Sequence, residues 1–146
     1  MISQTAEYAL RAVVCLVNCP DNTSIVSEIA TITKVPPSYL SKVLQSLRKA
    51  KIVKSQRGLY GGFKLAKPAE KISLLEVVNA VDPIQTIDSC PLNLEAHGNG
   101  LCALHKRLND TIVLTQKAFQ ESSVHEFLNC PDRDLSLCKV LDAKKR

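Results

Sequence analysis

Residues 37–68 read PSYLSKVLQSLRKAKIVKSQRGLYGGFKLAKP, a helical pattern followed by a hairpin pattern. In the first half, apolar residues recur at the three- and four-residue steps of one helix face. They are Leu40, Val43, Leu44 and Leu47, and Pro37 suits the first helical position. In the second half, residues 52–56 and 63–67 alternate apolar and polar side chains, as paired strands do. Three glycines lie in the connection, where the missing β-carbon lets a loop bend sharply and lie against another backbone.

Two more helices are expected before this stretch. Residues 3–18 carry a broad apolar stripe, and the helix should end before Pro20. Ser27 is placed to cap a short second helix, with Glu28 acidic in its first turn. A short helix, a tight turn and a longer amphipathic helix form the helix-turn-helix pattern, although a plain helical hairpin would read similarly. We therefore expect a mainly α protein with a small β-wing, in which residues 1–83 form a winged helix-turn-helix domain.

The basic residues are concentrated in the same region. Ten of the nineteen lie between Lys34 and Lys71, where Glu70 is the single acid. This excess of positive charge predicts a surface for a polyanion, although a solvated basic hairpin remains the alternative. The chain has no tryptophan and only 4% aromatic residues, which argues against single-strand binders that stack bases on aromatic side chains. Double-stranded DNA is therefore the expected partner.

Other classes of protein are disfavoured. The N-terminus has no cationic region, and Glu7 and Arg11 break the apolar run that follows, so we expect neither a signal peptide nor a membrane span. The protein is then expected to be cytoplasmic, with reduced cysteines. No Walker A loop, H-E-x-x-H, deaminase C-x-x-C or nucleophile elbow is present, so no enzymatic activity is expected.

A second site is expected after residue 83. Residues 84–100 read as a loop, and a helix is expected from about Leu101 to about Gln120. Cys102 and His105 are three residues apart at the start of this helix, and Cys90 lies in the loop. A thiolate and an imidazole at a helix start, beside another thiol, can hold a soft metal centre. Chance and packing are the alternative explanation of these three residues.

The same helix predicts a dimer. Its apolar residues are Leu101, Leu104, Leu108, Ile112, Thr115 and Phe119. A long helix that projects from a small domain needs a partner for such a stripe, and a second copy of the chain is the expected one. We therefore assign residues 101–128 to dimerisation and residues 129–146 to a C-terminal tail.

Several motifs resemble those of one family. They are ALRA at 9–12, SYL at 38–40, LRKA at 47–50, RGxxGGFxLA at 57–66 and ISLxEVxxAV at 72–81. Together they resemble the Rrf2 family of winged-helix transcription regulators, closely from about residue 2 to Pro83 and more loosely to about Leu128. The resemblance implies a homodimer that reads a partly palindromic operator, often under control of an iron–sulfur cluster or another small signal.

The resemblance also implies roles for individual residues in DNA binding. Positions that match base or phosphate contacts in the longer helix are Ser38, Tyr39, Ser41 and Lys42, and Arg57 matches a wing arginine that enters the minor groove. From their chemistry alone, Gln45 can pair with bases, whereas Lys49 neutralises phosphate. The expected wing contacts also include Gly58, Tyr60, Gly61 and Gly62. Lys51 replaces the glycine that normally ends this helix, so it must adopt a left-handed conformation or end the helix otherwise.

For the second site, the resemblance implies an iron–sulfur cluster. Relatives that bear one use three evenly spaced cysteines, followed by a histidine three residues after the last. Cys90, Cys102 and His105 match, but Ala96 occupies the middle position. His97, or Glu7 brought from the partner subunit, could supply the missing ligand; Glu7 could instead pair with Arg11.

The expected cofactor is a two-iron two-sulfur cluster in preference to a four-iron four-sulfur cluster, with one zinc ion or no cofactor as alternatives. The expected function is therefore a regulator that senses redox, iron or nitric oxide status. A cluster-free regulator that responds to a thiol metabolite or a protein partner is the alternative.

Overall fold

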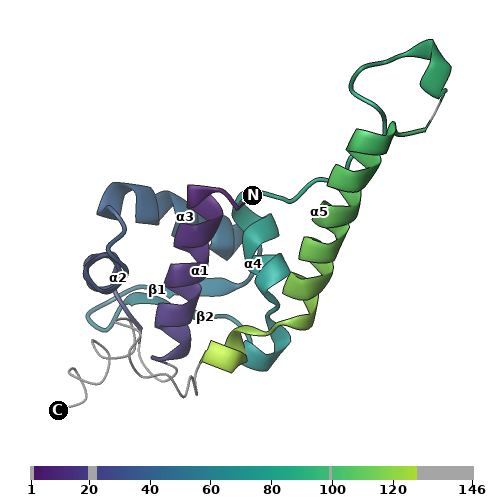
Figure 1. The fold of residues 1–146 in the computed structure, drawn as a ribbon. Helices are drawn as coiled ribbons and strands as arrows, with labels where there is room; N and C mark the ends of the chain where they lie inside the picture. Colours follow the sequence, from purple (N-terminus) through teal and green to yellow (C-terminus); the bar gives the residue numbers. More distant parts are fainter. Residues whose placement is uncertain (1, 20–22, 99, 128–146) are drawn as a thin grey trace.

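A computed structural model describes residues 2–19, 23–98 and 100–127. Its helices are α1 (Gln4–Val17), α2 (Val26–Thr33), α3 (Pro37–Lys49), α4 (Leu74–Val81) and α5 (Ala103–Glu121), and its strands are β1 (Val53–Gln56) and β2 (Gly62–Leu65). Short 3₁₀ turns are η1 (Ala69–Lys71), η2 (Glu95–His97) and η3 (Val124–Phe127). Figure 1 shows α1 to α4 and the hairpin gathered in one head, from which α5 projects toward a loop. The winged-helix fold expected from the sequence is confirmed.

The head is built around the apolar faces of α1 and α3. The apolar stripe expected on α3 is fully buried, as are Leu16 of α1 and Ile29 of α2. Helices α1 and α3 are in contact, and each also contacts α2 and α4. Because one face of α3 provides core side chains at helical spacing, its opposite face is turned toward solvent.

Two helix ends in the head can be compared with the sequence predictions, the start of α2 and the end of α3. The prediction that Ser27 caps α2 is wrong, because α2 begins at Val26 and Ile25 is the N-cap residue. No side chain caps α2, but the carboxylate of Glu28 accepts the backbone N–H of the N-cap residue Ile25 at 3.4 Å. At the end of α3, Lys51 adopts the left-handed conformation with φ of 60°, one of the two outcomes expected.

The hairpin lies against the loop that precedes α2. Strands β1 and β2 are antiparallel, with Val53 opposite Leu65 and Gln56 opposite Gly62. Phe63 exchanges two backbone hydrogen bonds with Ser24, at 2.8 and 2.9 Å. Gly62 has φ of 147°, and a β-carbon there would lie 2.7 Å from the carbonyl oxygen of Ser24. The close backbone approach expected of the glycine-rich connection therefore occurs at Gly62.

Helix α5 is fixed to the head at its C-terminal end. The backbone N–H of Leu74 donates to Ser122, and that of Val124 donates to Ile72. The segment between α4 and α5 follows α5, with the Asn109 side chain accepting the N–H of Ile87 at 2.8 Å. No residue of α5 is buried. Across the described residues, no helix is both long and apolar enough to span a bilayer.

Candidate nucleic-acid interface and metal centre

The outer face of α3 carries the predicted base and phosphate contacts. The residues that share this stripe are Ser38, Ser41, Lys42, Gln45 and Lys49. All of them are exposed except Ser41, which is half-buried and donates its hydroxyl to the carbonyl of Pro37 at 3.0 Å. The hydroxyl of Ser41 keeps its lone pairs for an outside donor. This face therefore presents short polar side chains and two flexible cations, which suits a major groove.

Tyr39 is held differently from its neighbours on α3. Its hydroxyl lies 2.6 Å from the hydroxyl of Thr5, and its ring packs edge-on against Tyr8 at a centroid distance of 5.5 Å. The ring of Tyr8 also lies 5.6 Å from the guanidinium of Arg11. Tyr39 thus positions the first turn of α3 against α1, a role that sequence reasoning missed, while 39% of it stays exposed.

Most basic residues between Lys34 and Lys71 have no ion pair with a described acidic residue. Within the described part of the chain, only Lys67 of these ten forms an ion pair, with Glu76. Arg48 instead donates to the hydroxyl of Ser55 at 3.4 Å and joins α3 to β1. Nine cations that form no ion pair with another described residue create a positive potential over α3 and the hairpin.

The tip of the hairpin is exposed and held in shape by the backbone. Arg57, Gly58, Leu59 and Tyr60 are all exposed, and Leu59 is 94% exposed. The N–H of Gly61 closes the loop on the carbonyl of Gly58 at 2.9 Å. Sequence reasoning missed Thr23, whose hydroxyl donates to the carbonyl of Tyr60 at 2.6 Å and ties the tip to the head. The wing residues predicted to contact DNA therefore lie together on one protruding loop.

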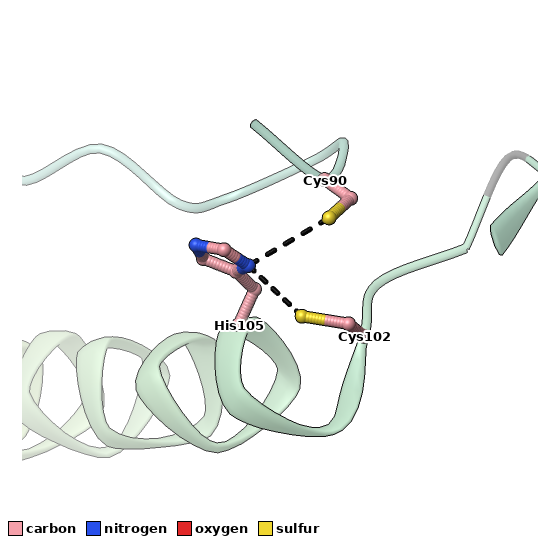
Figure 2. Close-up of side chains that lie close together, drawn as sticks. All are labelled: Cys90, Cys102 and His105. Carbon is pink, nitrogen blue, oxygen red and sulfur yellow. Dashed lines mark hydrogen bonds between the residues drawn. The ribbon is translucent and has the colours of Figure 1, made fainter. Parts of the chain in front are cut away.

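The predicted metal ligands converge at the start of α5. Donor atoms of Cys90, Cys102 and His105 all lie within 4.8 Å of one another. Figure 2 shows both thiols directed at Nδ1 of His105, at 3.7 Å from Cys90 and 3.0 Å from Cys102. Cys102 is the N-cap residue of α5, so this helix begins two residues later than expected.

Cys90 has a further imidazole neighbour. Nδ1 of His97 lies 3.6 Å from the Cys90 sulfur. This hydrogen bond, followed by one from the backbone of Leu92, lowers the pKa of the Cys90 thiol to about 6. Cys90 is buried, although the loop residues around it are exposed. The site therefore favours a thiolate at neutral pH, which is the form that binds metals and reacts with oxidants.

The donor set fits a soft metal or an iron–sulfur cluster. Thiolate and imidazole ligands lie at ~2.3 and ~2.0 Å from a tetrahedral metal, which places such a pair ~3.6 Å apart. Two of the sulfur–nitrogen distances between these side chains, 3.6 and 3.7 Å, are close to that value, and the third, from Cys102 to His105, is shorter at 3.0 Å. Little rearrangement is then needed for the side chains to bind such a group.

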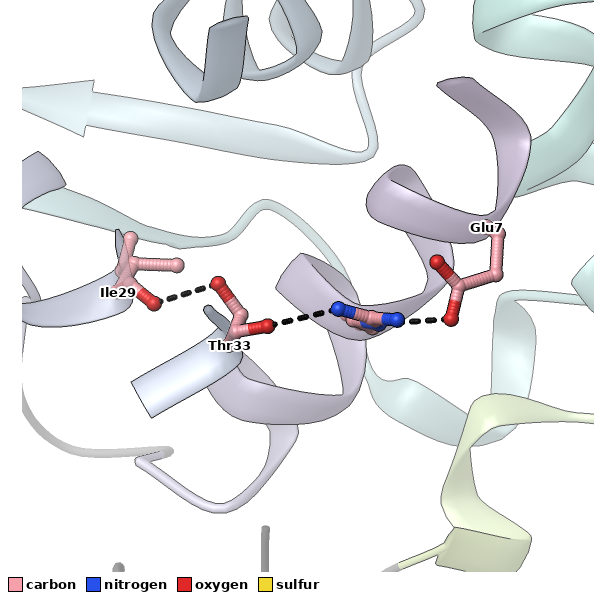
Figure 3. A network of polar contacts seen from close by, with 4 residues as sticks. Glu7, Ile29 and Thr33 are labelled. Atoms are coloured by element: carbon pink, nitrogen blue, oxygen red, sulfur yellow. Dashed lines mark hydrogen bonds and ion pairs between the residues drawn. The ribbon is translucent and has the colours of Figure 1, made fainter. Parts of the chain in front are cut away.

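Glu7 lies apart from this group and has a partner of its own. Its carboxylate accepts Nε of Arg11 at 2.6 Å, and Nη1 of Arg11 donates to the carbonyl of Thr33 at 3.0 Å. Figure 3 shows this chain of contacts continuing from the hydroxyl of Thr33 to the carbonyl of Ile29 at 2.6 Å. The ion pair that the sequence allows between Glu7 and Arg11 is therefore present, and Arg11 links α1 to the end of α2.

Comparisons with known proteins agree with this architecture. The family model "Rrf2: Iron-dependent Transcriptional regulator" matches residues 2–130. A relative from Aquifex aeolicus carries the name of an HTH-type transcriptional regulator. It is 28% identical to this chain over 138 residues, which cover 92% of this chain and 96% of that protein.

Two solved structures have a similar fold. CymR, the global cysteine regulator of B. subtilis, has a TM-score of 0.73 at 19% identity, with 88% of this chain and 96% of CymR covered. IscR of T. potens has a TM-score of 0.72 at 18% identity, with 92% of this chain and 90% of IscR covered.

Proposed function

The chain belongs to the Rrf2 family of transcriptional regulators, and on that premise we propose a homodimer whose binding to a DNA operator is controlled by an iron–sulfur cluster. The chain is a DNA-binding regulator of the helix-turn-helix type and is not an enzyme.

The observation that carries the DNA-binding proposal is the charge of the head. Nine basic residues between Lys34 and Lys71 have no ion pair among the described residues, and several flank the exposed polar stripe of α3. A phosphate backbone would neutralise them, while Ser38, Gln45 and Arg57 contact base edges from two sides. On this proposal α3 lies in the major groove and the wing reaches the adjacent minor groove.

The exposed face of α5 supports the dimer. Leu104, Leu108 and Leu114 lie within about a third of the circumference of α5 and are between 47% and 67% exposed. Apolar side chains along a projecting helix are stabilised when a second copy covers them, and two-fold pairing is the commonest arrangement. A pair of this kind would present two α3 helices to two half-sites of an operator.

The thiol–imidazole site supports control by a cluster. Cys90, Cys102 and His105 would hold the group, for which the two-iron form is favoured because one or more imidazoles join the thiolates. A bound cluster supplies one-electron redox chemistry and sensitivity to iron, oxidants or nitric oxide. Cys102 begins α5, and the loop that bears Cys90 is tied to α5 through Ile87 and Asn109. Ligation at this end would therefore alter how the loop and α5 pack.

A second candidate function is a cluster-free response to thiol chemistry. The lowered pKa of Cys90 favours it, because a thiolate reacts readily with disulfides and oxidants. The similar structure of CymR, named as a cysteine regulator, is consistent with this candidate. In that case Cys102 is the thiol placed to form a disulfide with Cys90.

One preparation separates these candidates. The protein is purified without oxygen from iron-replete cells, its iron and sulfide are measured, and a duplex is selected from random DNA. The proposal expects coloured protein with iron and sulfide in equal amounts, and an affinity for the selected duplex that changes at least tenfold when the cluster is removed. Colourless, iron-free protein that still binds the duplex would favour the thiol response instead.

A further inference from the structure

We infer that His97 of the same chain is the fourth ligand of the cluster site, and that Glu7 is not a ligand. The inference rests on the proposed function, because it concerns the cluster that this function requires. It gives a ligand set of two thiolates and two imidazoles, Cys90, His97, Cys102 and His105, that belongs entirely to one subunit.

The position of His97 is the first argument. Its Nδ1 lies 3.6 Å from the Cys90 sulfur, as close as Nδ1 of His105 lies to the same sulfur at 3.7 Å. The distance from His97 to Cys90 matches the ~3.6 Å that separates a thiolate and an imidazole on one tetrahedral metal. His97 is half-buried, whereas Glu95 and Ala96 of the same 3₁₀ turn are exposed. The turn therefore directs His97, and not Ala96, toward the thiols.

The arrangement of the four side chains is the second argument. His97 approaches Cys90, and His105 approaches Cys102 at 3.0 Å, so the donors form two thiol–imidazole pairs. His97 does not join the tighter group of Cys90, Cys102 and His105, whose donors lie within 4.8 Å of one another. A set extended in this way suits a group with two metal atoms better than a single ion, since each pair can bind one metal.

The contacts of Glu7 are the third argument. Its carboxylate is held by Arg11, which also bonds the carbonyl that ends α2 (Figure 3). Moving Glu7 to a metal would leave the Arg11 guanidinium, which also bonds the end of α2, without its carboxylate partner. His97 needs no such loss, because its neighbour in the described structure is already the Cys90 thiol.

The ligand set has a chemical consequence. Imidazole is a neutral ligand where a carboxylate or a third thiolate would add negative charge. Two imidazoles therefore raise the reduction potential of a two-iron cluster relative to all-thiolate ligation. A chain that replaces a cysteine by alanine and uses the adjacent histidine would gain a cluster that is easier to reduce.

The test compares His97→Ala with Glu7→Gln as its matched control, both reconstituted with iron and sulfide in the absence of oxygen. We expect His97→Ala to hold less than half of the wild-type iron, or to lose its cluster at least tenfold faster. Glu7→Gln should match the wild type in iron, sulfide and absorbance. The unfolding midpoint of each apo variant shows that the head remains folded.

A spectroscopic measurement counts the imidazole ligands of the wild-type cluster directly. In protein labelled with ¹⁵N-histidine, the reduced cluster should show hyperfine coupling to two imidazole nitrogens, and one of them should vanish in His97→Ala. Coupling to a single nitrogen, or cluster loss in Glu7→Gln with retention in His97→Ala, would overturn the inference while leaving the cluster proposal intact. A wild type that takes up no iron would overturn both.

Discussion

Replacement of Gly62 by alanine tests how the wing is held against the head. Gly62 has φ of 147°, and a β-carbon there would lie 2.7, 2.8 and 3.1 Å from the O, C and N atoms of Ser24. These are backbone atoms, so no side chain can rotate away. The strand must then separate from Ser24 and lose the two hydrogen bonds that Phe63 makes with it.

The expected loss of unfolding free energy follows from these contacts. Backbone strain at this conformation costs ~1–3 kcal/mol, and each lost hydrogen bond costs ~1 kcal/mol. Because the displaced strand relieves part of the strain, we expect a total of ~2–4 kcal/mol for Gly62→Ala. Gly58→Ala is the matched control, since Gly58 also has a positive φ, of 106°, but has open space around it.

Guanidinium unfolding, followed by circular dichroism at one protein concentration, measures both variants. Gly62→Ala should be at least ~1 kcal/mol less stable than Gly58→Ala, because only Gly62 adds a steric clash to the strain. It should also bind the selected duplex more weakly, since the wing is displaced. Equal stability of the two variants would refute the idea that contact with Ser24 holds the wing.

Three further predictions concern DNA, the dimer and the thiol. Arg57→Ala should weaken binding to the selected duplex by ~1–3 kcal/mol in anisotropy titrations. An equal loss of affinity for a random duplex would show that Arg57 contacts phosphate and not a base. Leu108→Asp should shift sedimentation toward the monomer, because Leu108 is 47% exposed on the apolar face of α5. Lys106→Ala, the control, should remain dimeric. If both variants remain dimeric, α5 does not form the dimer interface. The rate of alkylation of Cys90 in apo protein should be half-maximal near pH 6, because the lowered pKa of its thiol makes the thiolate predominate above about pH 6. A midpoint at pH ~8.5, the value of an ordinary thiol, would contradict the hydrogen bond from His97.

The helices and the hairpin could be predicted because their signals are local. The spacing of Leu40, Val43, Leu44 and Leu47 identifies the buried face of α3, and Pro37 marks its start. The cap of α2 could not be predicted reliably, because the local sequence allows either Ser27 as the N-cap residue or Glu28 at the third helical position, where it accepts the N–H of Ile25. The structure uses the glutamate, which places the helix start one residue before Ser27.

Contacts between distant residues explain what sequence reasoning missed. The bridge of Ser24 to Phe63 and the bond of Thr5 to Tyr39 join residues far apart in the chain, and neither carries a pattern in the sequence. In the metal centre, the spacing of Cys102 and His105 on one helix turn was informative. The choice between His97 and Glu7 depends on the path of an irregular loop, which spacing alone does not define.

Part of the sequence account stays a prediction. The tail assigned to residues 129–146, with Cys130 and Cys138, lies outside the described residues. The DNA contacts assigned to α3 and the wing likewise remain predictions, although the structure exposes most of those side chains on two neighbouring elements.

The salt dependence of duplex binding is the most direct test of the claim that the basic head binds double-stranded DNA. Affinity for the selected duplex is measured over a range of salt concentrations, for the wild type and for Lys42→Ala and Lys49→Ala. The account predicts a steep fall in affinity, with a log–log slope of ~0.9 for each phosphate contact. Each variant should lower the slope by ~2 in a dimer, because each removes one contact per subunit. A slope near zero for the folded dimer, or slopes unchanged in both variants, would contradict the account.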